Sequence, residues 1–234
     1  MFKLSPSTLS LFSECPRCFW LSLKKNHKRP KTPFPSLPNG IDKVLKEYFI
    51  AHAHTKLPLE IAQLTDMSIF TDLTKLTEWQ NPFKGIRYTN NEGHTLFGGI
   101  DMLLKDQNGA IIVLDFKTKG SKPMPDSEKY YIDQLSIYTW LFAQNGHTTT
   151  PFGYILFFYP EKITQKGIME YGTELKRVEL TTNVVQLFNT AIACLEGDMP
   201  QASNTCEYCK WYSERKQITE QPIQTKKQLT LFDL

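Results

Sequence analysis

Two aspartates and a lysine stand at the ends of two short apolar segments, where together they could hold a divalent cation. Residues 98–117 read GGIDMLLKDQNGAIIVLDFK, and an Asn-Gly turn separates the two apolar runs. Asp101 opens the first run, whereas Asp115 and Lys117 close the second. Carboxylate oxygens are preferred ligands of Mg²⁺ and Mn²⁺, and such ions polarise phosphates and activate water. The stretch therefore predicts metal-dependent phosphodiester chemistry.

A β-hairpin would bring these three side chains together. Because side chains alternate along a strand, Asp115 and Lys117 point to the same face. A hairpin centred on Asn108, closed by a three- or five-residue loop, pairs position 101 with position 115. The alternative interpretation is an ordinary cross-strand ion pair between Asp101 and Lys117, because the D-x-K pattern alone is common. The hairpin context favours the metal site.

Each residue of this hairpin has an expected role. Asp101 and Asp115 are the predicted ligands of one or two Mg²⁺ or Mn²⁺ ions, and the backbone carbonyl of Phe116 is a further candidate. Lys117 would orient the attacking water or neutralise charge in the transition state. The glycines at 98–99 leave space beside the strand for a ligand or for another segment of backbone.

The rest of the chain predicts helices and strands that would surround this hairpin in an α/β fold with a mixed central sheet flanked by helices. Apolar residues between positions 41 and 49 recur at helical spacing, whereas the aromatic and β-branched run 152–159 is typical of a buried strand. The four prolines of residues 30–40 exclude a helix or a central strand there, and Asn39 could cap the next helix. The helices are expected over residues 5–23, 40–49, 59–64, 72–79, 127–145 and 182–196, and the strands over 85–90, 95–105, 110–117, 152–159 and 173–180.

Length and composition allow one domain with a full core. The chain has 234 residues, of which 41% are hydrophobic and 22% are charged, as in an ordinary soluble protein. No run of 18 or more apolar residues is present, so no transmembrane helix is expected. The first residues lack the long apolar region and cleavage site of a signal peptide. We therefore expect a cytoplasmic protein that does not associate with membranes.

Positive charge is concentrated near the N-terminus. Residues 1–31 carry seven basic residues against one acid, Glu14, a balance of +6 within a net charge of +3 for the whole chain. Such a cluster suits the phosphate backbone of nucleic acid. A solvated helix end followed by a basic loop is the alternative. The basic residues are Lys3, Arg17, Lys24, Lys25, Lys28, Arg29 and Lys31.

Four cysteines form two C-x-x-C pairs near opposite ends of the chain. Cys15 and Cys18 make the first pair, and Cys206 and Cys209 make the second. In a chain expected in the cytoplasm, such pairs are more often metal ligands than disulfides. Either tetrahedral zinc or an iron–sulfur cluster would clamp the N-terminal helix to a C-terminal cysteine loop at 200–212. Four buried free thiols are the alternative.

Four segments together resemble the PD-(D/E)XK nuclease superfamily, in particular its RecB-like branch, which includes the CRISPR-associated exonucleases with an iron–sulfur cluster. The segments are SPSTLSLFSECPRCFWL at 5–21, GGID at 98–101, LDFKT at 114–118, and Gln134-x-x-x-Tyr138. The resemblance implies a restriction-endonuclease-like core and a DNA substrate. It also implies that Gln134 and Tyr138, four residues apart on one helix face, support the site or contact DNA. Without the resemblance, Tyr138 is equally well a core residue and Gln134 a polar residue of the helix surface.

The chain departs from the pattern of this branch in two places. A histidine ligand is usual on a helix ahead of the hairpin, whereas Asp42 of GIDKVLK at 40–46 stands there. Asp42 can still ligate a metal or hold a metal-bound water, or it is a first-turn acid favoured by the helix dipole. The branch usually supplies one N-terminal and three C-terminal cysteines, but here Arg215 stands near the last position, where Cys18 could substitute. The resemblance favours a 4Fe-4S cluster, whereas two C-x-x-C pairs alone favour zinc.

The C-terminal residues 228–234, QLTLFDL, resemble the peptide by which bacterial proteins dock on the DNA sliding clamp. Gln228, Leu229 and the Leu231–Phe232 pair match that peptide, and a polar linker precedes them. Such peptides insert apolar anchors into a preformed pocket, and a tether raises the local concentration of the enzyme on DNA. An apolar end that packs on its own domain is the alternative.

The sequence thus predicts a nuclease domain over residues 1–212, a flexible linker over 213–227 and a clamp-binding peptide over 228–234. The expected activity is metal-dependent hydrolysis of DNA in repair or replication, by an exonuclease or an enzyme that trims ends or flaps. The alternatives are a non-catalytic, clamp-associated DNA-binding adaptor and a nuclease of CRISPR spacer acquisition.

Overall fold

The computed structural model describes residues 1–30 and 36–220. The candidate clamp-binding residues Gln228, Leu229, Leu231 and Phe232 lie outside the described residues, as does the linker beyond residue 220. The elements are β1 (Lys3–Leu4), α1 (Pro6–Glu14), α2 (Pro16–Lys24), α3 (Ser36–Ala51), η1 (Leu59–Ile61), β2 (Met67–Ile69), α4 (Leu73–Gln80), β3 (Ile86–Thr89), β4 (Thr95–Gly98), β5 (Met102–Asp106), β6 (Ile111–Thr118), η2 (Ser127–Tyr131), α5 (Ile132–Gln144), β7 (Phe152–Ile163), β8 (Met169–Glu179), α6 (Val184–Glu196) and α7 (Glu207–Glu220).

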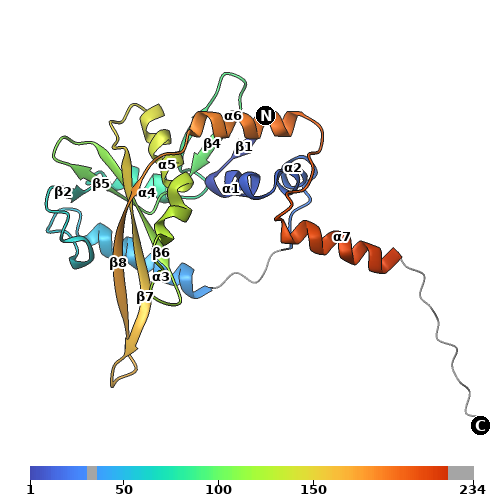
Figure 1. The fold of residues 1–234 in the computed structure, drawn as a ribbon. Coiled ribbons are helices and arrows are strands. Elements are labelled where there is room, and N and C mark those ends of the chain that lie inside the picture. The colour runs from blue at the N-terminus through green and yellow to red at the C-terminus, as the bar shows by residue number, and fades with distance from the viewer. Residues whose placement is uncertain (31–35, 221–234) are drawn as a thin grey trace, which may run out of the picture.

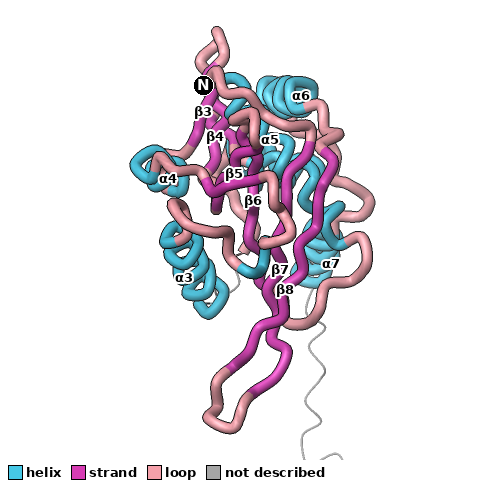
Figure 2. Tube along the Cα trace, turned by 90° about the vertical axis from the view of Figure 1, so that its left-hand side faces the viewer, coloured by secondary structure: helices cyan, strands magenta, loops and turns pink. Residues whose placement is uncertain are grey.

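The centre of the fold is a five-stranded mixed sheet in the order β2-β5-β6-β7-β8. Strand β6 pairs antiparallel with β5 and parallel with β7, and the long β7–β8 hairpin extends well beyond the other strands (Figure 1). A smaller sheet has the order β1-β4-β3. Figure 2 shows α3 and α4 on one side of the strands and α6 on the other. The predicted mixed α/β fold, with helices flanking a mixed sheet, is confirmed.

The central strands are buried because both faces of the sheet are covered. Residues 111–116 of β6 and 153–158 of β7 are buried along their whole length, including the residues of alternating faces. Such continuous burial requires apolar side chains on both faces, which explains the unbroken runs IIVL and YILFF. The ring of Phe116 packs on that of Phe49 from α3 at a centroid distance of 4.8 Å, so this helix is fixed against the strand that carries Asp115.

The predicted hairpin is present, with the register expected for it. Met102 pairs with Leu114, and the following pairs continue that register toward the turn. Asp106 closes the turn, since its carboxylate accepts hydrogen bonds from the amides of Asn108 and Ala110 at 2.9 and 2.8 Å. Gly109 has a φ of 79°, a left-handed conformation that favours glycine. Extending the register by one residue places Asp101 opposite Asp115.

The single strand predicted over residues 95–105 is wrong, because the chain leaves one sheet and enters the other at residues 99–101. Strand β4 ends at Gly98 and β5 begins at Met102, and the two strands belong to different sheets. The amide of Ile100 donates to the carbonyl of Trp79 at the end of α4 instead of to a strand. A Cβ atom on Gly99 would lie 3.2 Å from the Gln80 carbonyl oxygen, so this glycine permits the close approach of α4.

The N-terminal helical region consists of two helices instead of one. Ser5 caps α1 in a capping box with Thr8, as the Ser-Pro-Ser start predicts. The chain is extended at Cys15, where α1 ends, and Pro16 opens α2. Proline is tolerated at this position because the first amides of a helix have no intrahelical acceptor.

The starts of two predicted helices differ from the structure. Helix α3 begins at Ser36, so Asn39 lies within the helix and does not cap it. Pro38 stands in the first turn of α3, where a missing amide costs no hydrogen bond. Residues 127–145 form the 3₁₀ turn η2 followed by α5, and Gly146, with φ of 82°, follows the helix end as predicted.

The C-terminal described segment is a helix where a loop and linker were predicted. Helix α7 runs from Glu207 to Glu220, so residues 213–220 are helical (Figure 1). Half of its residues are strong helix formers, and Lys210 pairs with Glu207 in its first turn at 3.0 Å. None of the described helices has both the length and the apolar character needed to cross a bilayer.

Candidate active site

Because β5 begins only at Met102, its pairing with β6 stops at Leu114, and the Asp101 carboxylate covers the edge of β6 that follows. Oδ2 of Asp101 accepts a hydrogen bond from the backbone amide of Phe116 at 2.9 Å. A residue in an extended strand points its N–H and C=O to the same side, so the Phe116 carbonyl also faces Asp101. Gln80, at the end of α4, fixes the backbone of Asp101, because its side-chain amide donates to the Asp101 carbonyl at 2.6 Å. The predicted ligands Asp101 and Phe116 are therefore neighbours.

Asp115 lies beside Asp101 and is almost completely buried. Its exposed fraction is 2%, and Gln134 donates to its Oδ1 from α5 at 2.9 Å. Burial, followed by the negative charge of Asp101, raises the pKa of Asp115 to about 7, although Lys117 opposes the shift. A buried carboxylate with this pKa is poised to exchange its proton for a metal ion near neutral pH.

Lys117 pairs with Asp115. The alternative interpretation, an ordinary ion pair, required it to pair with Asp101 instead. Its Nζ lies 2.6 Å from Oδ2 of Asp115 and 4.8 Å from the ring centre of Tyr131. Burial alone would lower the pKa of Lys117, but the charges of Asp115 and Asp101 outweigh burial and raise it. The two residues share one face of β6, as strand alternation predicts, and that face is turned toward α5.

Asp42 reaches the same cluster through a lysine that the sequence analysis did not single out. Lys46 follows Asp42 by one helical turn on α3, and its Nζ lies 2.8 Å from Oδ2 of Asp42. The same Nζ lies 2.8 Å from Oδ1 of Asp101, so it bridges the two carboxylates. Burial, then the charge of Asp101, raises the pKa of Asp42. The i, i+4 spacing of Asp42 and Lys46 was the available signal.

Gln134 and Tyr138 are adjacent on the face of α5 that covers the site. Gln134 Nε2 also contacts the Tyr138 hydroxyl at 3.2 Å, so one amide joins Asp115 to the tyrosine. Burial, then the charge of Asp115, raises the pKa of Tyr138, which keeps the phenol protonated. The space beside Gly98 is filled by the Tyr138 ring, because a Cβ there would lie 2.5 Å from Cε1 of that ring.

A cleft of about 710 Å³ opens over this cluster, a volume typical of substrate sites. Lys46, which contacts Asp101, and Gln134, which contacts Asp115, both line it. Its walls come from α1, α3, the end of α4, the β4–β5 connection, the η2 turn and α5. The other lining residues include Ser5, Ser7, Ser10, Asp42, Gln80, Gly98, Gly99, Tyr130, Tyr131 and Tyr138.

The donor set at this cluster fits a hard divalent cation. Oδ2 of Asp115 is buried and faces the Lys117 ammonium at 2.6 Å, while Oδ1 accepts the hydrogen bond from Gln134. With Asp101 and the Phe116 carbonyl on the same side, the cluster offers oxygen ligands only. Oxygen ligands are those that Mg²⁺ and Mn²⁺ select.

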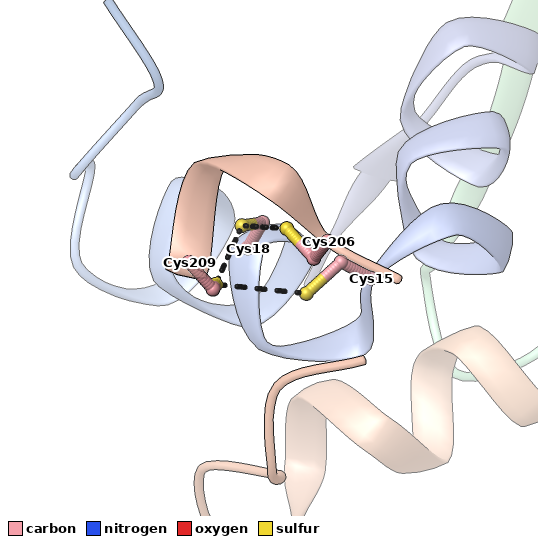
Figure 3. A group of neighbouring side chains, drawn as sticks. All are labelled: Cys15, Cys18, Cys206 and Cys209. Carbon is pink, nitrogen blue, oxygen red and sulfur yellow. Dashed lines mark hydrogen bonds between the residues drawn. The ribbon is translucent and has the colours of Figure 1, made fainter. Parts of the chain in front are cut away.

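The four paired cysteines meet in a second cluster, away from the carboxylates. Cys15 and Cys18, at the start of α2, face Cys206 and Cys209, at the start of α7 (Figure 3). All four Sγ atoms lie within 4.8 Å of one another, and none forms a disulfide. Burial opposes ionisation of Cys15, but amides of Ser203 and Cys18 and the neighbouring thiols lower its pKa to about 7. Thiolates are the metal-binding form of cysteine, so this group suits a metal.

Arg29 of the basic N-terminal region belongs to this cysteine cluster. Its Nη2 donates to Sγ of Cys206 at 3.2 Å, and its Nη1 pairs with Glu14 at 2.7 Å. A guanidinium beside several thiolates offsets part of their negative charge. Arg29 is therefore already engaged within the protein, which leaves the other basic residues of the region as candidates for phosphate contacts.

Comparison with known proteins identifies the family. The family described as the PD-(D/E)XK nuclease superfamily matches residues 41–213, a span that contains Asp42, Asp101, Asp115 and Lys117. The chain belongs to the PD-(D/E)XK nuclease superfamily. Members of this superfamily are typically metal-dependent nucleases, which implies a DNA substrate.

The other comparisons add a distant structural likeness. The crystal structure of SSO0001 is 14% identical in sequence, with 91% of this chain and 85% of that chain covered and a TM-score of 0.47. A search of curated proteins finds no match. The predicted superfamily is confirmed by the family match, whereas the RecB-like branch stays a prediction from the sequence segments quoted above.

Proposed function

We propose that this PD-(D/E)XK protein hydrolyses phosphodiester bonds of DNA in the cleft above Asp101 and Asp115, using Mg²⁺ or Mn²⁺. The observation that carries the proposal is the convergence of these two carboxylates with Lys117 on one edge of β6. A buried carboxylate such as Asp115 beside a second carboxylate is unfavourable without a cation, as the raised pKa of Asp115 indicates. Such a strained arrangement is more typical of a functional site than of a structural ion pair.

Each residue of the site has a separate proposed role in hydrolysis. A divalent ion held by Asp101, Asp115 and the Phe116 carbonyl would polarise the scissile phosphate and acidify the attacking water. Lys117, held against Asp115, can donate to that water or to a non-bridging phosphate oxygen. Phe116 N–H and Gln134 keep the two carboxylates in position through hydrogen bonds to Asp101 and Asp115.

We further propose that the substrate is a DNA end instead of an internal sequence. The motifs of the RecB-like branch, including Gln134 and Tyr138, support this choice because enzymes of that branch process ends. Linear and circular single-stranded DNA of equal length, incubated with Mn²⁺, separate the two modes. We expect loss of the linear form with release of short products and persistence of the circle. Equal cleavage of both forms would contradict end processing while leaving the hydrolytic site intact.

The distances between thiols support a single zinc ion at the cysteine cluster. Four ligands placed tetrahedrally about 2.3 Å from one ion lie about 3.8 Å apart. Sγ of Cys18 lies 3.5 Å from Cys209 and 3.7 Å from Cys206, and Sγ of Cys15 lies 3.9 Å from Cys209. In a 4Fe-4S cluster each cysteine binds a different iron, so the thiols must be spread more widely. We therefore prefer zinc to the cluster that the family resemblance favours.

Metal analysis of protein purified without oxygen tests this choice. We expect colourless protein with one zinc ion per chain, lost in Cys206→Ser and kept in the matched variant Cys194→Ser, whose thiol lies outside the cluster. Brown protein with iron and a broad absorption near ~400 nm would show a 4Fe-4S cluster instead.

The clamp-binding peptide remains a proposal from the sequence alone. Removal of residues 228–234 should abolish binding to a bacterial sliding clamp in surface plasmon resonance. The same truncation should leave hydrolysis of a free oligonucleotide unchanged, since the cleft is built from residues before 139. Retained clamp binding by the truncated chain would refute the docking role.

A further inference from the structure

The Lys46 ammonium lies between two carboxylates of the candidate active site, those of Asp42 and Asp101. Its Nζ is 2.8 Å from Oδ1 of Asp101 and 2.8 Å from Oδ2 of Asp42, both within the range of charge-assisted hydrogen bonds. Helix α3 supplies both Asp42 and Lys46, and the ring contact of Phe49 with Phe116 holds this helix against β6. The lysine is therefore placed by the fold and not by chance contact of an exposed side chain, since only 20% of its side chain is exposed.

Asp101 has two oxygens that face different partners. Oδ2 faces the Phe116 amide on the side of Asp115, whereas Oδ1 faces Lys46 on the side of Asp42. Nucleases with two metal ions place both ions about 3.5–4 Å apart on a shared carboxylate. In this chain Asp101 is the carboxylate that two metal ions could share. The position between Asp101 and Asp42, however, already holds the Lys46 ammonium.

The charges of the cluster agree with a single ion. Three carboxylates, from Asp42, Asp101 and Asp115, face two ammonium groups, from Lys46 and Lys117. One divalent ion exceeds the remaining negative charge by one, which suits the approach of an anionic phosphate. A second divalent ion would have to displace Lys46 from both of its carboxylates, because it would need the same oxygens.

We propose that this chain binds one divalent ion, between Asp101 and Asp115, and that Lys46 takes the place of the second ion of a two-metal nuclease. The inference rests on the proposed function, because it assigns the cations of the same site. In this role Lys46 neutralises Asp42 and Asp101 and presents an ammonium to the cleft that it lines. Its position allows contact with a phosphate oxygen of the substrate.

Isothermal titration calorimetry with Mn²⁺ alone tests this assignment, because it measures the number of ions bound per chain. The wild type should bind one Mn²⁺ per chain, whereas Lys46→Met should bind two. The double variant Asp42→Asn with Lys46→Met should return to one, since it lacks a carboxylate of the second position. Lys43→Met is the matched control: this lysine is on the same helix, 78% of its side chain is exposed, and it should leave the count at one.

The outcomes separate this inference from the proposed function. Two Mn²⁺ ions on the wild type, or one on a folded Lys46→Met, would overturn the role of Lys46 while retaining the metal site. No Mn²⁺ binding by the wild type would overturn the proposed function and this inference together. Circular dichroism melts establish which variants are folded, and Lys46→Ala replaces Lys46→Met if the latter is not.

Discussion

Gln134 on α5 donates a hydrogen bond to Oδ1 of Asp115 on β6 at 2.9 Å, and the same amide contacts the Tyr138 hydroxyl at 3.2 Å. Replacement by leucine would leave Oδ1 of Asp115 without this donor, so that Lys117 alone would orient the carboxylate. We expect Gln134→Leu to lower Mn²⁺ affinity and activity by about 10–100-fold, as for other residues that orient metal ligands.

A comparison of two leucine variants measures this effect. Mn²⁺ affinity by calorimetry and the thermal melt should be recorded for Gln134→Leu and for Gln186→Leu, which changes an exposed glutamine of α6. A fall in affinity confined to Gln134→Leu supports the positioning role. Unchanged affinity in Gln134→Leu would show that Asp115 needs no support from α5.

Gly98 is required by the ring of Tyr138. Because an added Cβ would lie 2.5 Å from Cε1 of that ring, Gly98→Ala must displace Tyr138 or β4. We expect a loss of about 1–3 kcal/mol in the free energy of unfolding, together with reduced activity. Gly120→Ala is the matched control, since its Cβ would meet nothing within 4 Å.

The double variant Gly98→Ala with Tyr138→Leu locates the cause of this loss. If the clash with the ring is responsible, the two substitutions should destabilise less together than the sum of their separate effects in urea denaturation. Strictly additive effects would mean that Gly98 is needed for a reason other than the tyrosine.

Asp115 should make the protein less stable at alkaline pH when no divalent ion is bound. Its pKa rises from an ordinary value of 3.8 to about 7 in the folded chain, so between these values the folded state binds more protons than the unfolded state. Stability from this group is therefore fully present below about pH 4 and is lost as the pH rises through about 7.

The Asp115→Asn variant tests that linkage. After dialysis against buffer free of Mg²⁺ and Mn²⁺, it should be more stable than the wild type at pH 8, by on the order of 1–3 kcal/mol, and inactive. At pH 4 the two proteins should differ little, because the wild-type carboxyl is then protonated. A variant that is less stable than the wild type at pH 8 would show that the Lys117 ion pair dominates.

The sequence was sufficient to predict the β5–β6 hairpin and its register, because two independent signals indicated the same pairing. The Asn-Gly turn limits the loop length, and the apolar runs on each side make a shifted register expose core residues such as Val113. With the register determined, alternation along β6 places Asp115 and Lys117 on one face. The convergence of the charged residues could therefore be predicted without knowledge of the other elements.

Lys46 and the break at residues 99–101 could not be predicted, because both depend on packing between distant segments. Residues 95–105 have the composition of a continuous strand, and only the approach of α4 to Gly99 directs the chain into a second sheet. Lys46 is one of two lysines on α3, and which of them faces inward depends on how the helix packs on Phe116. Helix α7 was missed because it has little apolar surface of its own, apart from the residues near the cysteine cluster.

The measurement that tests the central claim most directly is the rate at which linear single-stranded DNA is degraded with Mn²⁺ by wild type and Lys117→Met. We predict that the variant remains folded and is slower by at least about 100-fold, because Lys117 is the cation nearest the buried Asp115. Lys75→Met, which changes an exposed lysine of α4 outside the cleft, should retain the wild-type rate. Equal degradation by wild type and Lys117→Met, or none by either, would contradict a hydrolytic centre at Asp101, Asp115 and Lys117 and would favour a DNA-binding adaptor without catalytic activity.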